Sequence, residues 1–169
     1  MLRKFADIGN TVAKQYGSGI YRISDWAHVV NAHLVAGPGV IQGLKTAVKE
    51  RTDRACLLIA QMSSEGSLKN KSYVQSAYLN ALKHDDFVIG FICQSRLTND
   101  PRFVHFTPGV NITEKGDSLG QVYNTPETAV ANGADVLIVG RAITNAADPA
   151  EAARKFRTRG FAAYEKLTQ

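Results

Sequence analysis

The possible fold classes are limited most by the stretch Val136-Leu137-Ile138-Val139-Gly140-Arg141-Ala142-Ile143. Its four leading aliphatic residues predict a strand that is buried on both faces, and the residues after Gly-Arg read as the start of a helix. Glycine lets the backbone approach a phosphate closely, a helix start offers free N–H groups, and the arginine fork matches phosphate oxygens. The stretch therefore predicts a phosphate site at the carboxyl end of a parallel strand.

The rest of the chain alternates short apolar runs with longer amphipathic ones. We predict strands at 28–35, 55–62, 87–93, 103–107 and 135–139, and helices at 8–15, 40–50, 73–83, 126–132 and 149–167. Continuous apolar strands separated by helices indicate a parallel sheet with both faces covered, so the fold class is α/β. An eight-stranded α/β barrel takes about 250 residues. The chain is therefore either a small open α/β sheet or a barrel without its first strands.

Composition limits the remaining function classes. The 169 residues are 44% hydrophobic and 21% charged, which fits one globular domain over 1–169. The sequence contains no stretch of 18 apolar residues and no secretory signal, so we expect a cytosolic protein that does not cross a membrane. We also expect no nucleic-acid partner and no metal, because no binding signature or ligand spacing is present. Cys56 and Cys93 lie in apolar runs and are predicted to be small buried side chains.

Two loops follow predicted strands and carry polar residues. Hydroxyls in 63–67 would stand at the carboxyl end of a strand, where they could bind a ligand, although the same residues could form a turn that caps the next helix. The second loop runs from Thr107-Pro108-Gly109-Val110 to Gly120-Gln121-Val122-Tyr123, and its glycines would let it move as a lid. A long surface loop is the alternative interpretation.

The segment Arg3-Lys4-Phe5-Ala6-Asp7-Ile8-Gly9-Asn10-Thr11 is the remaining candidate. An ammonium at Lys4 and a carboxylate at Asp7 could form a charged pair that keeps the lysine protonated, as a proton donor requires. Taken alone, such spacing is more often a surface ion pair of about 0–1 kcal/mol.

Together these motifs resemble the eukaryotic orotidine 5'-phosphate decarboxylases, in order along all 169 residues. The chain is similar to the decarboxylase half of animal uridine monophosphate synthases and to the free-standing fungal enzymes. The matching segments are 3–11, 62–68, 107–110, 116–123 and 138–141. The resemblance implies a (β/α)8 barrel and a homodimer that needs no cofactor or metal and that acts on orotidine 5'-phosphate to yield uridine monophosphate (UMP).

The resemblance also implies a role for each site residue. Lys4 would donate the proton to C6 of the pyrimidine, and Asp7 and Thr11 would act across the dimer interface, Asp7 in the charged network and Thr11 on the ribose. Ser63 would bind the pyrimidine, and Pro108 would begin the lid. The phosphate would be held by four residues, Gln121, Tyr123, Gly140 and Arg141.

The chain departs from the family pattern in three places. Met1 and Leu2 stand where the family has Glu-Asp, and Gln61 stands where it has Glu. The first two strands, most of the third and the second lysine of the catalytic network have no counterpart here, so we expect an incomplete barrel that is inactive by itself. Either the true start lies upstream, or the chain is a deliberate fragment, or it is a truncated non-catalytic paralogue that binds a nucleotide phosphate or a partner protein.

Overall fold

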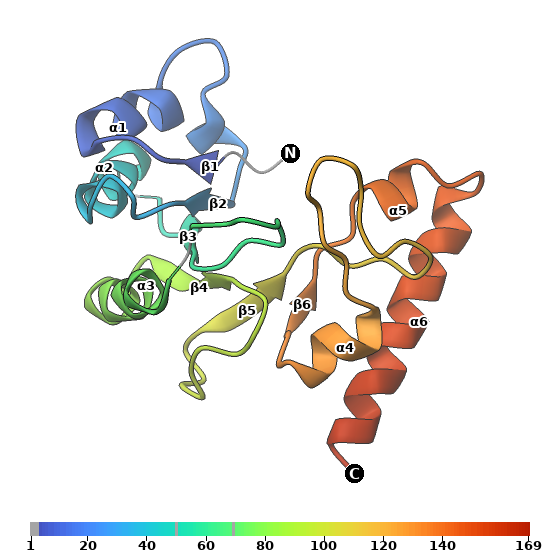
Figure 1. The fold of residues 1–169 in the computed structure, drawn as a ribbon. Helices are drawn as coiled ribbons and strands as arrows, with labels where there is room; N and C mark the ends of the chain where they lie inside the picture. Colours follow the sequence, from blue (N-terminus) through green and yellow to red (C-terminus); the bar gives the residue numbers. More distant parts are fainter. Residues whose placement is uncertain (1–3, 50, 69) are drawn as a thin grey trace. The chain divides into compact units, whose positions relative to one another are not determined.

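A computed structural model describes residues 4–49, 51–68 and 70–169. Met1 and Leu2, where the sequence departs from the family, and Glu50, the predicted end of a helix, lie outside these residues. The elements in chain order are β1 (Lys4–Phe5), α1 (Gly9–Gly17), the 3-10 helix η1 (Ile23–Asp25), β2 (Val29–Ala32), α2 (Gly39–Val48), β3 (Ala55–Ile59), α3 (Lys71–Lys83), β4 (Val88–Ile92), β5 (Val104–Thr107), α4 (Pro126–Ala131), β6 (Val136–Leu137), α5 (Arg141–Thr144) and α6 (Pro149–Leu167) (Figure 1).

The chain divides into two compact units, which we describe separately. Unit 1 comprises the described residues up to 60 together with 70–91 and 100–103, and unit 2 comprises those of 61–69, 92–99 and 104–169. The printed strand pairs, β1 with β2 and β2 with β3 in unit 1 and β5 with β6 in unit 2, are parallel, so the predicted α/β class is confirmed. No helix in the described ranges is long and apolar enough to cross a membrane.

Unit 1 places the short strand β1 beside β2, in parallel register, and β2 beside β3. Helices α1 and α2 pack against each other (Figure 1). The side chain of Phe5 is fully buried and meets the ring of Tyr16 edge-on, with 5.5 Å between centroids. Because Phe5 is buried, its neighbour Lys4 points to the opposite face of the strand. Cys56 is buried too, as predicted, and burial raises the pKa of its thiol to about 12.

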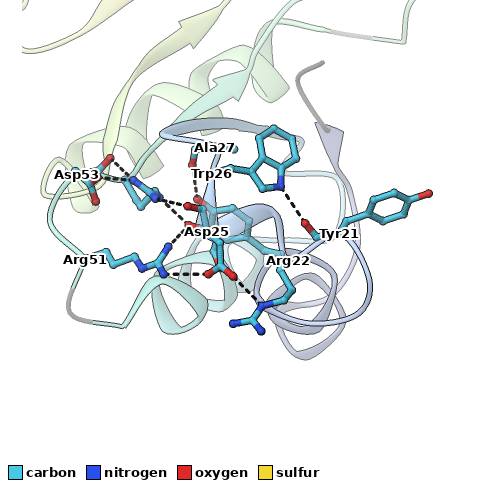
Figure 2. Close-up of polar contacts among 10 residues, drawn as sticks. Tyr21, Arg22, Asp25, Trp26, Ala27, Arg51 and Asp53 are labelled. Carbon is cyan, nitrogen blue, oxygen red and sulfur yellow. Dashed lines mark hydrogen bonds and ion pairs between the residues drawn. The ribbon is translucent and has the colours of Figure 1, made fainter.

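A polar network in unit 1 stabilises the connection between α1 and β2, residues 18–28 (Figure 2). The Arg54 side chain is only 5% exposed, and its Nε donates to the carbonyl of Ser24 at 2.8 Å. Arg51 donates to the same carbonyl at 2.6 Å and to Asp25 Oδ1 at 3.0 Å. Trp26 Nε1 donates to Tyr21 O at 2.9 Å. The bonds of Arg54 and Arg51 to the buried Ser24 satisfy a buried polar group, so we interpret the network as structural.

Unit 2 pairs β5 with β6 and packs α6 against α4 and α5 (Figure 1). Its core is a cluster of buried residues, Val110, Ala129 and Phe156. The strand β6 is shorter than the predicted 135–139, because its partner β5 ends at Thr107, directly before Pro108. Ile138 N still donates to Thr107 O at 2.9 Å, but proline has no N–H with which to extend the ladder. Cys93 is buried, as predicted.

Candidate functional site

Six of the nine predicted site residues lie in unit 2 and three in unit 1. Within unit 2, Gln121 is bonded to Ser63. Gln121 Nε2 donates to Ser63 Oγ and to Ser63 O, each at 2.9 Å, and Val122 N donates to Ser63 O at 2.8 Å. The glycine-bearing loop is therefore joined to the loop that follows β3. The next helix, α3, is capped by Asn70, whose Oδ1 accepts from Tyr73 N at 2.9 Å. The capping alternative for the hydroxyls of 63–67 is therefore wrong.

Gly109 stands where these two loops meet. Its φ is +75°, and a Cβ at this position would lie 2.6 Å from Ser63 Cβ and 2.9 Å from Gln121 Nε2. Only glycine meets both constraints without strain. The neighbouring Pro108 accepts a hydrogen bond at its carbonyl from Gln94 Nε2 at 3.0 Å, and Gln94 Oε1 accepts from Asn124 Nδ2 at 3.1 Å. The start of the loop is therefore held by side-chain amides that the sequence analysis did not identify.

Arg141 is the first residue of the short helix α5, and Gly140 precedes it, as predicted. Arg141 Nη1 lies 2.7 Å from Asp117 Oδ2, and its guanidinium carbon lies 6.0 Å from the centroid of the Tyr123 ring. The hydrogen bond that Arg141 donates to the Asp117 carboxylate raises the pKa of Arg141. The Arg141 side chain is 55% exposed, so the guanidinium is accessible to an anion.

Asp117 was missed by the sequence analysis as a site residue. Its Oδ1 accepts from Leu119 N at 2.9 Å and from Gln121 N at 3.0 Å. The backbone N–H of Gln121, followed by the Arg141 guanidinium, holds the pKa of this carboxyl below its usual range. An aspartate that follows a glycine is common in turns, so its sequence alone gave no functional signal.

Gln61 occupies the position of the family's glutamate. Its Oε1 accepts from Gln94 N at 2.7 Å and from Ser95 N at 3.1 Å. An amide oxygen can accept these neutral N–H bonds as a carboxylate oxygen can. Gln61 therefore holds the backbone at Gln94 and Ser95, in the loop after β4.

The unit 1 residues surround the start of α1. Lys4 lies in β1 and is exposed. Asp7 Oδ1 accepts from Ile8 N at 2.8 Å, directly before α1. Thr11 lies on α1 and is half-buried. Within the described residues Lys4 and Asp7 form no ion pair, so the suggested charged pair within one chain is not present. Asn31 stands in register with Lys4 on β2, is 3% exposed, and its Oδ1 has no hydrogen-bond partner in the described residues.

His33 follows Asn31 near Lys4. Burial, and then the charge of Lys4, lowers the pKa of His33. The Oη of Tyr73, from α3, accepts from Leu34 N at 3.0 Å and lies 3.5 Å from His33 Nδ1. No group of three or more His, Cys, Asp or Glu side chains that could hold a metal ion occurs in the part of the chain that the structure describes.

Comparison with known proteins gives a consistent result. The family model described as "Orotidine 5'-phosphate decarboxylase / HUMPS family" matches residues 3–156. Uridine 5'-monophosphate synthase of Bos taurus is 49% identical over 163 residues, which are 96% of this chain and 34% of that protein. Orotidine 5'-phosphate decarboxylase of Schizosaccharomyces pombe is 46% identical over 167 residues, which are 97% of this chain and 63% of that protein. The chain thus spans about a third of the length of the first relative and under two thirds of the length of the second.

A solved structure resembles the chain in fold. It is orotidine 5'-monophosphate decarboxylase from Sulfolobus solfataricus, with a TM-score of 0.70 and 24% sequence identity. The match covers 95% of this chain and 72% of that structure.

Proposed function

We propose, since the chain belongs to the orotidine 5'-phosphate decarboxylase / HUMPS family, that it is the carboxyl-terminal part of an orotidine 5'-phosphate decarboxylase. The enzyme would convert orotidine 5'-phosphate to UMP and carbon dioxide, the last step of de novo pyrimidine biosynthesis. The observation that carries this proposal is the grouping within unit 2 of Ser63 with Gln121 and of Arg141 with Tyr123.

The phosphate-binding part of the mechanism belongs to unit 2. Arg141 offers a charged fork at the start of α5, and Gln121 and Tyr123 lie on the loop that its partner Asp117 shapes. A phosphate is remote from the reacting carbon, so its binding energy can stabilise the closed loop over the substrate. We assign Ser63 to the pyrimidine and Pro108 to the start of the lid.

The proton-transfer part belongs to unit 1. When carbon dioxide leaves, the electron pair of the broken bond stays on C6 of the pyrimidine, and the Lys4 ammonium donates a proton to that carbon. A fixed ammonium stabilises negative charge that develops only in the transition state. Asp7 and Thr11 would complete the site of a second subunit in a homodimer, in keeping with an Asp7 carboxylate that does not pair with Lys4 of its own chain. No cofactor or metal enters this scheme.

The complete enzyme would be a (β/α)8 barrel of which this chain supplies the last part of strand three through strand eight. The family match and the partial coverage of the Sulfolobus solfataricus structure support this assignment. A second proposal is a non-catalytic paralogue that binds a nucleotide phosphate or a partner protein. It is favoured by Leu2, which stands where the family has the aspartate immediately before Arg-Lys.

The test compares the affinities of the chain for UMP and for uridine, by NMR titration so that weak binding is also measured. We expect UMP to bind more tightly than uridine, and Arg141→Ala to cost about 1.5–3 kcal/mol for UMP because a charged hydrogen bond is lost. Arg154→Ala is the matched control, since Arg154 also pairs with one carboxylate in unit 2, at 2.9 Å. An unchanged UMP affinity in Arg141→Ala would contradict the assignment.

A further inference from the structure

The Asp117 carboxylate bonds to both sides of the candidate phosphate site in unit 2. Oδ2 pairs with Arg141 Nη1 at 2.7 Å, while Oδ1 accepts the backbone N–H groups of Leu119 and Gln121. The backbone N–H of Asp117 donates in turn to Gln121 O at 3.1 Å. One side chain thus shapes the turn that presents Gln121 and also orients the guanidinium on α5.

We propose that Asp117 is the positioning residue of the phosphate site, an inference that rests on the proposed function. Asp117 does not itself bind the phosphate, because two anions repel each other. It holds Arg141 in the orientation in which the phosphate meets it, and it holds the turn in the conformation that presents Gln121.

The geometry of the pair leaves room for a phosphate. A guanidinium has five N–H donors, and Asp117 contacts Nη1 alone. Nε and Nη2 of Arg141 have no hydrogen-bond partner among the described residues, and the guanidinium carbon lies over the Tyr123 ring, 6.0 Å from its centroid. A side chain that is already oriented loses less rotamer freedom when it binds its ligand. The exposed arginine therefore depends on Asp117 for its order.

Asp117 also has an opposing effect, because its negative charge repels a phosphate. This repulsion acts whether or not Arg141 is present, whereas positioning requires Arg141. A double-mutant cycle separates the two effects, since it measures only the part that depends on both residues.

The variants are Asp117→Asn, Arg141→Ala and the double variant. Asparagine keeps an Oδ1 that accepts the two backbone N–H groups, so the turn is retained while the charged pair with Arg141 is lost. Glu151→Gln is the control, because it removes the same charge from the exposed carboxylate that pairs with Arg154 in the same unit. Equal unfolding midpoints of the variants would show that each retains its fold.

We expect Asp117→Asn to weaken UMP binding about threefold or more when Arg141 is present, within the usual range for contacting residues. It should not weaken UMP binding in the Arg141→Ala background, and it should leave uridine binding unchanged. An equal effect of Asp117→Asn on UMP binding in both backgrounds would overturn the positioning role.

The failures of the two proposals are distinguishable. If Arg141→Ala weakens UMP binding but Asp117→Asn has the same effect in both backgrounds, the positioning role alone is wrong. If Arg141→Ala has no effect on UMP binding, or if the unaltered chain does not bind UMP, the phosphate site itself is wrong and the role of Asp117 is wrong with it.

Discussion

Gln121 Nε2 donates to Ser63 Oγ at 2.9 Å, although the two residues are 58 positions apart in the chain. The bond joins the loop after β3 to the glycine-bearing loop, both within unit 2. In the proposed function Ser63 meets the pyrimidine and Gln121 the phosphate, so this contact would link recognition of the two ends of the nucleotide.

Gly109→Ala should disrupt this junction. The added Cβ would lie 2.6 Å from Ser63 Cβ, and overpacking of this kind costs about 1–3 kcal/mol. A further cost of about 1–2 kcal/mol comes from a left-handed φ of +75°. Gly120→Ala is the matched control, because its φ is +83° and no atom lies within 4 Å of the added Cβ. Denaturant unfolding should show the larger loss of stability for Gly109→Ala, and equal losses would contradict the close approach.

Glu127 makes stability depend on pH. The Arg159 guanidinium on α6 donates to the Glu127 carboxylate on α4 at 2.7 and 2.9 Å, so the pair links the two helices. These bonds lower the pKa of the carboxyl from 4.5 to about 2. A lowered folded-state pKa stabilises the fold above pH 4.5, and this contribution disappears as the pH falls through 2. Both side chains are more than one third exposed, so Glu127→Gln should cost only about 0.5–1 kcal/mol at pH 7.

The measurement for Glu127→Gln is the free energy of unfolding at pH 7 and at successively lower pH. The difference from the unaltered chain should shrink as the pH falls below 4.5, the ordinary pKa of the carboxyl. Glu151→Gln serves as the control, because its pair with Arg154 lies within one helix and joins no two elements. A loss that is the same at every pH would rule out the ion pair as its cause.

The sequence predicted those features that depend on local patterns. Gly140 and Arg141 could be placed at a helix start because an aliphatic strand, a glycine and a helical pattern follow one another directly. The contact of Ser63 with Gln121 could not be predicted, since periodicity carries no information on which distant loops meet. Asp117 was missed for a different reason: an aspartate that follows a glycine, here Gly116, is equally typical of an ordinary turn.

An apolar groove beside β6 predicts that the chain self-associates. The groove encloses about 960 Å³ in unit 2, and its lining includes Leu137, Val139, Ile143, Phe156, Phe161 and Tyr164. Among the described residues of this unit, β6 has β5 as its only strand neighbour, and a strand with an open edge can pair with another chain. We expect self-association in light scattering and binding of a hydrophobic dye.

Phe161→Ser should reduce the dye signal, because Phe161 lines the groove and is exposed. Leu79→Ser is the control, since Leu79 is an exposed apolar residue on α3 in unit 1. A monodisperse monomer with a sharp unfolding transition would argue instead for a complete small domain.

The 169 residues by themselves should not decarboxylate orotidine 5'-phosphate at a meaningful rate. The Lys4 side chain is exposed and makes no ion pair with Asp7 in the described residues, and Leu2 can neither orient an ammonium nor hold its charge. Stabilisation of a transition state requires charges that are already in place, and members of such a network are not additive, so the loss of several leaves little activity. Loss of substrate absorbance would be followed for the chain and for Lys4→Ala, and we expect equal background rates. Turnover that depends on Lys4 and approaches that of a complete decarboxylase would show that these residues form a working site without the missing strands.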